Sequence, residues 1–183
     1  MKNLFLAILL ACFAGMAMAD DMQATPASAA TPPTGVMKAM CTLSSASGSQ
    51  VQGWVKFTQL KSSVLVEGDV TGLTPGKHGF HIHDKGDCSA PDATSAGGHF
   101  NPMKQMHGVP NSTKSHMGDL GNIKADSTGH AKFKFKNKII QLSGEYSIVD
   151  RAIIVHAALD DEKTQPTGNA GARVACGVIA ASN

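Results

Sequence analysis

The sequence lacks a charge excess, a long apolar segment and helical periodicity, and each absence narrows what the chain can do. Its 16 basic and 14 acidic residues nearly cancel, so the chain has no basic field for nucleic acid. Its N-terminal apolar run, residues 4–14, is too short to cross a bilayer comfortably. Few segments have the apolar spacing of helices, which leaves short strands as the expected elements.

The N-terminus has the pattern of a secretory signal peptide (residues 1–19). Lys2 precedes the apolar run, and Ala17-Met18-Ala19 is a small-x-small cleavage site before Asp20. Cleavage there leaves 183 − 19 = 164 residues, enough for one domain with a core. Leu9-Leu10-Ala11-Cys12 also matches a lipoprotein cleavage box, so a lipid anchor on Cys12 is the alternative to a soluble periplasmic protein.

The rest of the chain divides into a tether and one folded domain. Residues 20–35 contain three prolines and almost no large apolar side chains, so this segment is predicted to be disordered. Residues 36–183 contain eight segments with β-branched or alternating residues between turn residues, which predicts an all-β, eight-stranded sandwich or barrel. The predicted strands are Met37–Leu43, Val51–Gln59, Val64–Val70, His78–His83, Gly118–Ala125, Ala131–Lys136, Arg151–Ala157 and Val174–Ala180.

Potential metal ligands are too numerous for a single ion. They are His81, His83, His99, His107, His116, Asp119 and His156. Two metal ions are the simplest interpretation. His81 and His83 alternate with apolar residues on a predicted strand, so both rings leave the same face and form half of a site suited to copper, zinc, nickel or iron.

The later ligands differ in kind, because His99, His107, His116 and Asp119 lie in a loop rich in Gly, Pro and Asn. Three nitrogens and one carboxylate oxygen make the closed tetrahedral shell that zinc prefers. A single histidine is usually an ordinary surface or hydrogen-bonded residue, but such a group in segments not otherwise rich in histidine favours metal sites. The remaining histidines are assigned no metal: His78 is predicted to be structural and His130 exposed.

Four longer motifs follow one another along the chain: Gly79–His83, Ser95–Pro102, His116–Asn122 and Gly168–Ile179. In this order they resemble copper/zinc superoxide dismutase, here of a bacterial, exported type. The resemblance runs from about Val36 to the C-terminus. It implies a Greek-key barrel with long metal-binding and substrate-channel loops. It also implies an enzyme that converts two superoxide anions and two protons to hydrogen peroxide and dioxygen, protecting the cell envelope. Family members differ in whether they pair, so a homodimer stays open.

The resemblance also implies one copper and one zinc ion per subunit. The implied copper ligands are His81, His83, His99 and His156, and the implied zinc ligands are His99, His107, His116 and Asp119. Copper is redox-active and needs an open position, whereas the closed shell with a carboxylate suits zinc. His99 would bridge the two metals, detach from reduced copper and deliver a proton to the second superoxide.

Other roles are likewise implied by the resemblance. Arg173 would dock the superoxide anion, because its guanidinium stays charged and offers forked donors. Thr167 would line the substrate channel, and Asp160 would bond to ligands of both metals. Pro166 stands where a steering lysine is often found in this family, and Lys163 is only a weak substitute.

Three cysteines would remain after signal cleavage. An oxidising compartment favours a disulfide, and the family resemblance pairs Cys88 with Cys176. Cys41 lies in a predicted strand and is expected to be a small buried apolar residue.

Two other classes of function fit less of the sequence. A non-catalytic domain of the same fold, such as a copper chaperone module or a metal-storage protein, would lack a copper ligand or the arginine. A secreted binding module stabilised by zinc would leave His81, His83 and His156 unexplained. Methionines near the zinc loop (Met103, Met106, Met117) suggest copper delivery, although loop packing is the commoner use of methionine.

Overall fold

The computed structural model describes residues 35 and 37–182. The predicted signal peptide and nearly all of the predicted tether therefore lie outside the described residues. The described elements are β1 (Lys38–Ser45), β2 (Gln52–Gln59), β3 (Val64–Thr71), β4 (Gly76–His83), the 3-10 helix η1 (Thr94–Ala96), β5 (Asp119–Ala125), β6 (Ala131–Asn137), β7 (Ala152–His156) and β8 (Arg173–Ser182). All eight predicted strands are confirmed, with ends shifted by two residues at most. In this part of the chain no helix is long and apolar enough to cross a membrane.

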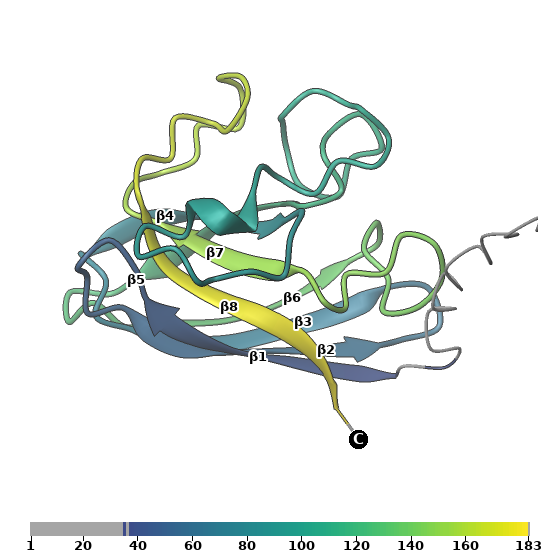
Figure 1. The fold of residues 1–183 in the computed structure, drawn as a ribbon, viewed down its shortest axis with the longest axis horizontal. Helices are drawn as coiled ribbons and strands as arrows, with labels where there is room; N and C mark the ends of the chain where they lie inside the picture. Colours follow the sequence, from purple (N-terminus) through teal and green to yellow (C-terminus); the bar gives the residue numbers. More distant parts are fainter. Residues whose placement is uncertain (1–34, 36, 183) are drawn as a thin grey trace, which may run out of the picture. The chain divides into compact units, whose positions relative to one another are not determined.

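The strands form one sheet in the order β5-β4-β7-β8-β1-β2-β3-β6. Every neighbouring pair is antiparallel. The outer strands β5 and β6 also approach each other, so the sheet nearly closes into a barrel (Figure 1). The connections from β3 to β4 and from β6 to β7 pass between non-adjacent strands, which confirms the predicted Greek-key topology.

Alternation along most strands fills the barrel with apolar side chains. In β1, Ala39, Cys41 and Leu43 point inward while the residues between them are exposed, as a two-residue period requires. Phe57 and Ile153 are fully buried in the same core. Burial raises the pKa of the Cys41 thiol to about 12, so this cysteine is an unreactive core residue, as predicted.

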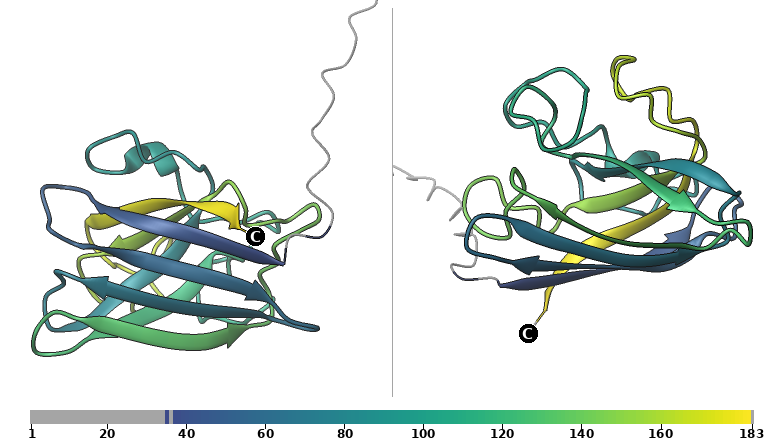
Figure 2. Two further views of the ribbon diagram at one scale, coloured as in Figure 1. Left: turned by 90° about the horizontal axis from the view of Figure 1, so that it is seen from below. Right: turned by 180° about the vertical axis from the view of Figure 1, so that it is seen from behind.

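Strands β4 and β7 depart from this alternation because both of their faces are buried. The last six residues of β4 and all five of β7 are buried. Two long connections, residues 84–118 between β4 and β5 and residues 157–172 between β7 and β8, rise on the same side of the barrel (Figures 1 and 2). They cover the outer side of these two strands, and the predicted metal ligands lie in this covered layer.

Candidate metal centre

Four histidines from three segments meet on the outer side of β4 and β7. His81 and His83 leave the same face of β4, and His156 ends β7, which pairs with β4. His99 comes from the long β4–β5 connection, where its backbone forms an isolated bridge with His83. One ring nitrogen from each lies within 4.8 Å of all the others. The structure thus brings together the four residues predicted to hold copper.

These four rings carry buried nitrogens that have no hydrogen-bond partner. The atoms are His81 Nδ1, His83 Nε2, His99 Nε2 and His156 Nε2, and Asn137 Nδ2 is the only other such side-chain atom among the described residues. Leaving buried polar atoms unpaired costs free energy. The donor set therefore fits a metal ion, because four convergent imidazole nitrogens suit copper.

The other nitrogen of each ring in this group is held in place, which fixes which nitrogen is free. His81 Nε2 lies 2.8 Å from an Asp160 carboxylate oxygen. His83 Nδ1 donates to the carbonyl of Gly97 at 2.9 Å, and His156 Nδ1 donates to the carbonyl of Gly171 at 3.1 Å. Such outer contacts set ring orientation and tautomer in metal sites.

The second group also converges, around one oxygen of Asp119. Asp119 Oδ1 lies 2.8 Å from His99 Nδ1, 3.0 Å from His107 Nδ1 and 3.2 Å from His116 Nδ1. Two of these nitrogens, on His99 and His116, are 3.4 Å apart. Tetrahedral zinc ligands at about 2.0–2.1 Å would be separated by about 3.3–3.4 Å. The set fits zinc, and His99 belongs to both groups through its two nitrogens.

Burial keeps most of the copper-side rings neutral. It lowers the pKa of His99 to about 4 and that of His156 to about 3, and it holds the pKa of His83 well below its ordinary value. Neutral imidazole is the form that binds metal. His107 differs: burial lowers its pKa, but hydrogen bonds with Asp119 and Asp160 outweigh this and raise it to about 9.

Asp160 contacts one histidine of each group, and its predicted role toward the two metals stays a prediction. Its Oδ2 pairs with His81 Nε2, and its Oδ1 lies 2.9 Å from His107 Nε2. Asn122 on β5 holds the Asp160 backbone in both directions, donating to its carbonyl at 3.0 Å and accepting from its N–H at 2.9 Å. Asn122 was not predicted as a site residue. At Gly168 (φ 67°) a Cβ would collide with Asp160 and His107, so only glycine fits.

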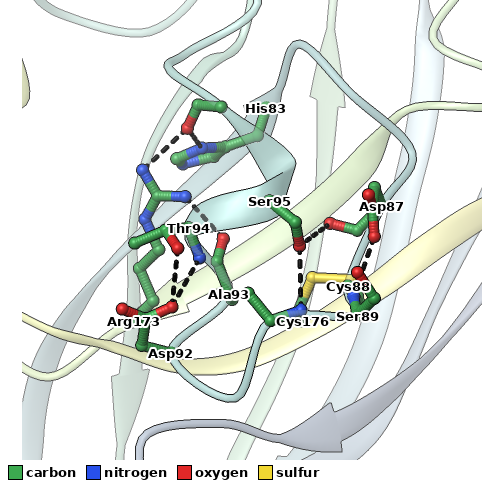
Figure 3. The surroundings of a disulfide bond; sticks show 12 residues. His83, Asp87, Cys88, Ser89, Asp92, Ala93, Thr94, Ser95, Arg173 and Cys176 are labelled. Atoms are coloured by element: carbon green, nitrogen blue, oxygen red, sulfur yellow. Dashed lines mark hydrogen bonds between the residues drawn. A yellow bond between two sulfur atoms is a disulfide. The ribbon is translucent and has the colours of Figure 1, made fainter.

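Arg173 begins β8 and reaches toward the segment before His99 (Figure 3). Its Nη1 donates to the carbonyl of Ala93 at 2.6 Å and its Nη2 to the carbonyl of Gly97 at 2.7 Å. The Gly97 carbonyl also accepts from His83, so one oxygen links the arginine to a copper-side ring. Burial lowers the Arg173 pKa and Asp92 opposes this, and a guanidinium stays charged at neutral pH.

The predicted disulfide between Cys88 and Cys176 is present, with Cα atoms 5.8 Å apart. It ties the segment that carries the Ala93 and Gly97 carbonyls to β8, three residues from Arg173 (Figure 3). Both cysteines pack in a small apolar cluster with Ala93. The disulfide thus holds the acceptors of Arg173 against the strand that carries it.

The remaining predicted residues have mixed outcomes. His78, predicted to be structural, is buried, and its two ring nitrogens contact the carbonyls of His156 and Thr74. His130, predicted to be exposed, is partly exposed: 40% of its side chain is accessible, and its Nε2 lies 2.6 Å from Asp69 Oδ1. Thr167 is half-buried, and its role in the channel stays a prediction.

Comparison with known proteins decides the family. A family model described as copper/zinc superoxide dismutase matches residues 51–179. The chain belongs to the copper/zinc superoxide dismutase family. The enzyme is therefore an oxidoreductase that acts on superoxide, and its histidine clusters suit copper and, where Asp119 joins, zinc.

Relatives span much of the enzyme. The chain is 47% identical over 133 residues to an extracellular copper-zinc superoxide dismutase of Haemonchus contortus, and this match covers 69% of the chain and 72% of the relative. A copper-zinc superoxide dismutase of Arabidopsis thaliana is 45% identical over 154 residues, covering 80% and 92%. One of Mesembryanthemum crystallinum is 46% identical over 152 residues, covering 79% and 96%. A non-catalytic or purely structural role is not supported by these similarities.

Proposed function

We propose that the enzyme binds copper through His81, His83, His99 and His156 and zinc through His99, His107, His116 and Asp119. The observation that carries this assignment is the set of four buried, unpartnered ring nitrogens that converge beside β4. When bound, copper supplies one-electron chemistry toward superoxide, and zinc supplies a fixed positive charge that holds the loop. The protein's own side chains dock the substrate and supply a proton.

Arg173 docks the substrate anion. Its guanidinium is anchored through Nη1 and Nη2 to two carbonyls, so its charge stays at one position beside the His83 ring. Half-burial of the side chain reduces solvent screening of that charge, which favours a small anion at the site. Thr167 would bound the channel through which superoxide enters.

His99 handles a proton. Its Nδ1 is held at Asp119, while its Nε2 has no partner in the protein. We assign Nε2 as the atom that holds one proton and passes it to the second superoxide. With one electron from the bound copper and a second proton from water, that superoxide would leave as hydrogen peroxide. Asp160 keeps the His81 and His107 rings in register through its two carboxylate oxygens, so the geometry around His99 is preserved during turnover.

Metal analysis combined with a superoxide-consumption assay tests the proposal. The loaded enzyme should contain one copper and one zinc per chain, lose activity when copper is removed and regain it on copper addition. Zinc-only protein is the matched control and should stay folded but inactive. Full activity in protein stripped of copper would refute the assignment.

Export to the periplasm of a bacterium is the proposed location. The signal pattern in residues 1–19 supports it, and so does the Cys88–Cys176 disulfide, because disulfides persist in oxidising compartments. A relative named as extracellular agrees with export, although the relatives reported above are from a nematode and plants. Mass spectrometry of the mature protein separates the alternatives: an Asp20 N-terminus indicates a soluble form, and a lipid-modified Cys12 indicates an anchored one.

We also propose that two copies pair through the outer face of β8, β1 and β2. Large apolar side chains are exposed there: Met40 (44%), Val178 (39%) and Trp54 (38%). Strand register places them close together, since Met40 pairs with Ala180 and Thr42 with Trp54. Sedimentation at micromolar protein should give a dimer, and Val178→Glu should give a monomer. A monomeric wild type would refute the pairing.

A further inference from the structure

Arg151 lies just before β7, and its side chain contacts three other residues. Its Nη1 donates to the Asp84 carbonyl at 2.6 Å and lies 3.1 Å from Asp84 Oδ1. Its Nε donates to the Ser147 carbonyl at 3.1 Å. Its Cζ lies 3.5 Å from the centroid of the Phe100 ring. The edge of the guanidinium is thus used for hydrogen bonds while its face stacks on an aromatic ring.

Both main partners of Arg151 are direct sequence neighbours of copper-side histidines. Asp84 follows His83, and Phe100 follows His99. Arg151 therefore contacts the backbone one residue beyond one ligand and the side chain one residue beyond the other. Its hydrogen bonds and its stacking contact go to the neighbours of these histidines.

The two segments that Arg151 joins form a short backbone ladder. Asp84 donates to the Gly98 carbonyl at 2.9 Å, and Phe100 donates to the Ile82 carbonyl at 2.8 Å. Within this ladder the rings of His83 and His99 have centroids 5.0 Å apart and planes at 61°. A shift of one segment against the other would move one unpartnered ring nitrogen relative to the other.

We propose that Arg151 is a positioning residue for the copper cluster, which fixes the segments after His83 and His99 against each other through Asp84 and Phe100. This inference rests on the proposed copper ligands. The charge pair with Asp84 is not the main contribution, because the Asp84 side chain is 58% exposed and exposed ion pairs contribute little. The carbonyl contact and the stacked ring carry the effect.

Lysine separates these contributions, because it keeps the charge but has neither a planar face nor a fork. In Arg151→Lys, copper affinity should fall about tenfold, the lower end of the range for outer contacts of metal ligands. The Cu(II) electron paramagnetic resonance spectrum of the fully loaded enzyme should change as well. Lys134→Gln is the matched control, because it breaks an ion pair between Lys134 on β6 and Glu67 on β3. Its copper affinity and its Cu(II) spectrum should be those of the wild type.

A second variant guards against misfolding of the first. Phe100→Leu keeps an apolar side chain but removes the aromatic face, and its spectrum should differ from that of the wild type as that of Arg151→Lys does. Wild-type copper affinity and an unchanged spectrum in either folded variant would overturn the inference, even if unfolding free energy falls. The wild-type spectrum tests the proposed function separately: absence of nitrogen-bound copper there would refute the ligand assignment itself.

Discussion

Removal of the Cys88–Cys176 disulfide should destabilise the fold by an amount set by the chain that it closes. The cysteines are 88 residues apart, and for a loop of this length the chain-entropy model gives roughly 4–5 kcal/mol. Alanine is the suitable replacement, because Cys176 is 3% exposed and already packs among alanines. The double variant Cys88→Ala/Cys176→Ala should therefore lose about this much unfolding free energy.

Urea unfolding of the metal-free protein measures the loss without the contribution of bound ions. Wild type treated with a reductant should unfold at nearly the same urea concentration as the double variant. Superoxide consumption by the reloaded variant should also fall while its copper content is unchanged, because the carbonyls that anchor Arg173 are no longer held to β8. A loss of less than about 1 kcal/mol would refute the entropic reasoning, since that is far below the usual range.

Three further outcomes are expected. His81→Ala should abolish turnover with zinc largely retained by metal analysis; equal loss of both metals would contradict the separate assignment. Arg173→Glu should slow superoxide consumption about tenfold or more at low salt, with a nearly unchanged copper spectrum and a smaller loss in Arg173→Lys; undiminished activity of the charge-reversed variant would remove Arg173 from the mechanism. The unfolding free energy of the metal-free protein should decrease as the pH falls from about 6.5 toward 4. The reason is that His99 and His156 take up protons in the unfolded chain but stay neutral when buried in the folded one. Each of these histidines should lower the unfolding free energy by about 1.4 kcal/mol per pH unit. Urea unfolding at stepped pH measures this, and a flat profile would contradict it.

Much of the fold could be predicted because local patterns and global packing agree. Alternation of apolar and polar residues specified the strands, and the alternation of His81 and His83 with apolar residues correctly placed both rings on one face of β4. The cysteine pairing needed the family resemblance, since three cysteines allow three different pairs and spacing does not choose among them.

Contacts that depend on the path of a long loop could not be predicted. The acceptors of Arg173 are carbonyls, which every residue possesses, so no side-chain pattern marks Ala93 or Gly97. Asn122 acts on the backbone of Asp160, 38 residues away, and only the closed barrel brings them together. His130 was predicted from its turn alone, whereas its partner Asp69 lies on a strand distant in sequence.

The Gly97 carbonyl, which serves both His83 and Arg173, has a consequence for how this site tolerates change. A carbonyl cannot be removed by substitution, so exchanging exposed side chains such as Asp92 or Thr94 removes neither the Ala93 nor the Gly97 acceptor, although it breaks the hydrogen bonds between Asp92 and Thr94 in the same turn. Insertion or deletion of one residue between Cys88 and His99 displaces them together, because the disulfide fixes one end of the segment and the ladder at β4 fixes the other. A change in the length of this loop, more than a change of residue type, would therefore move Arg173 and the His83 ring at the same time. Evolution or design could alter substrate docking and the copper site together in this way.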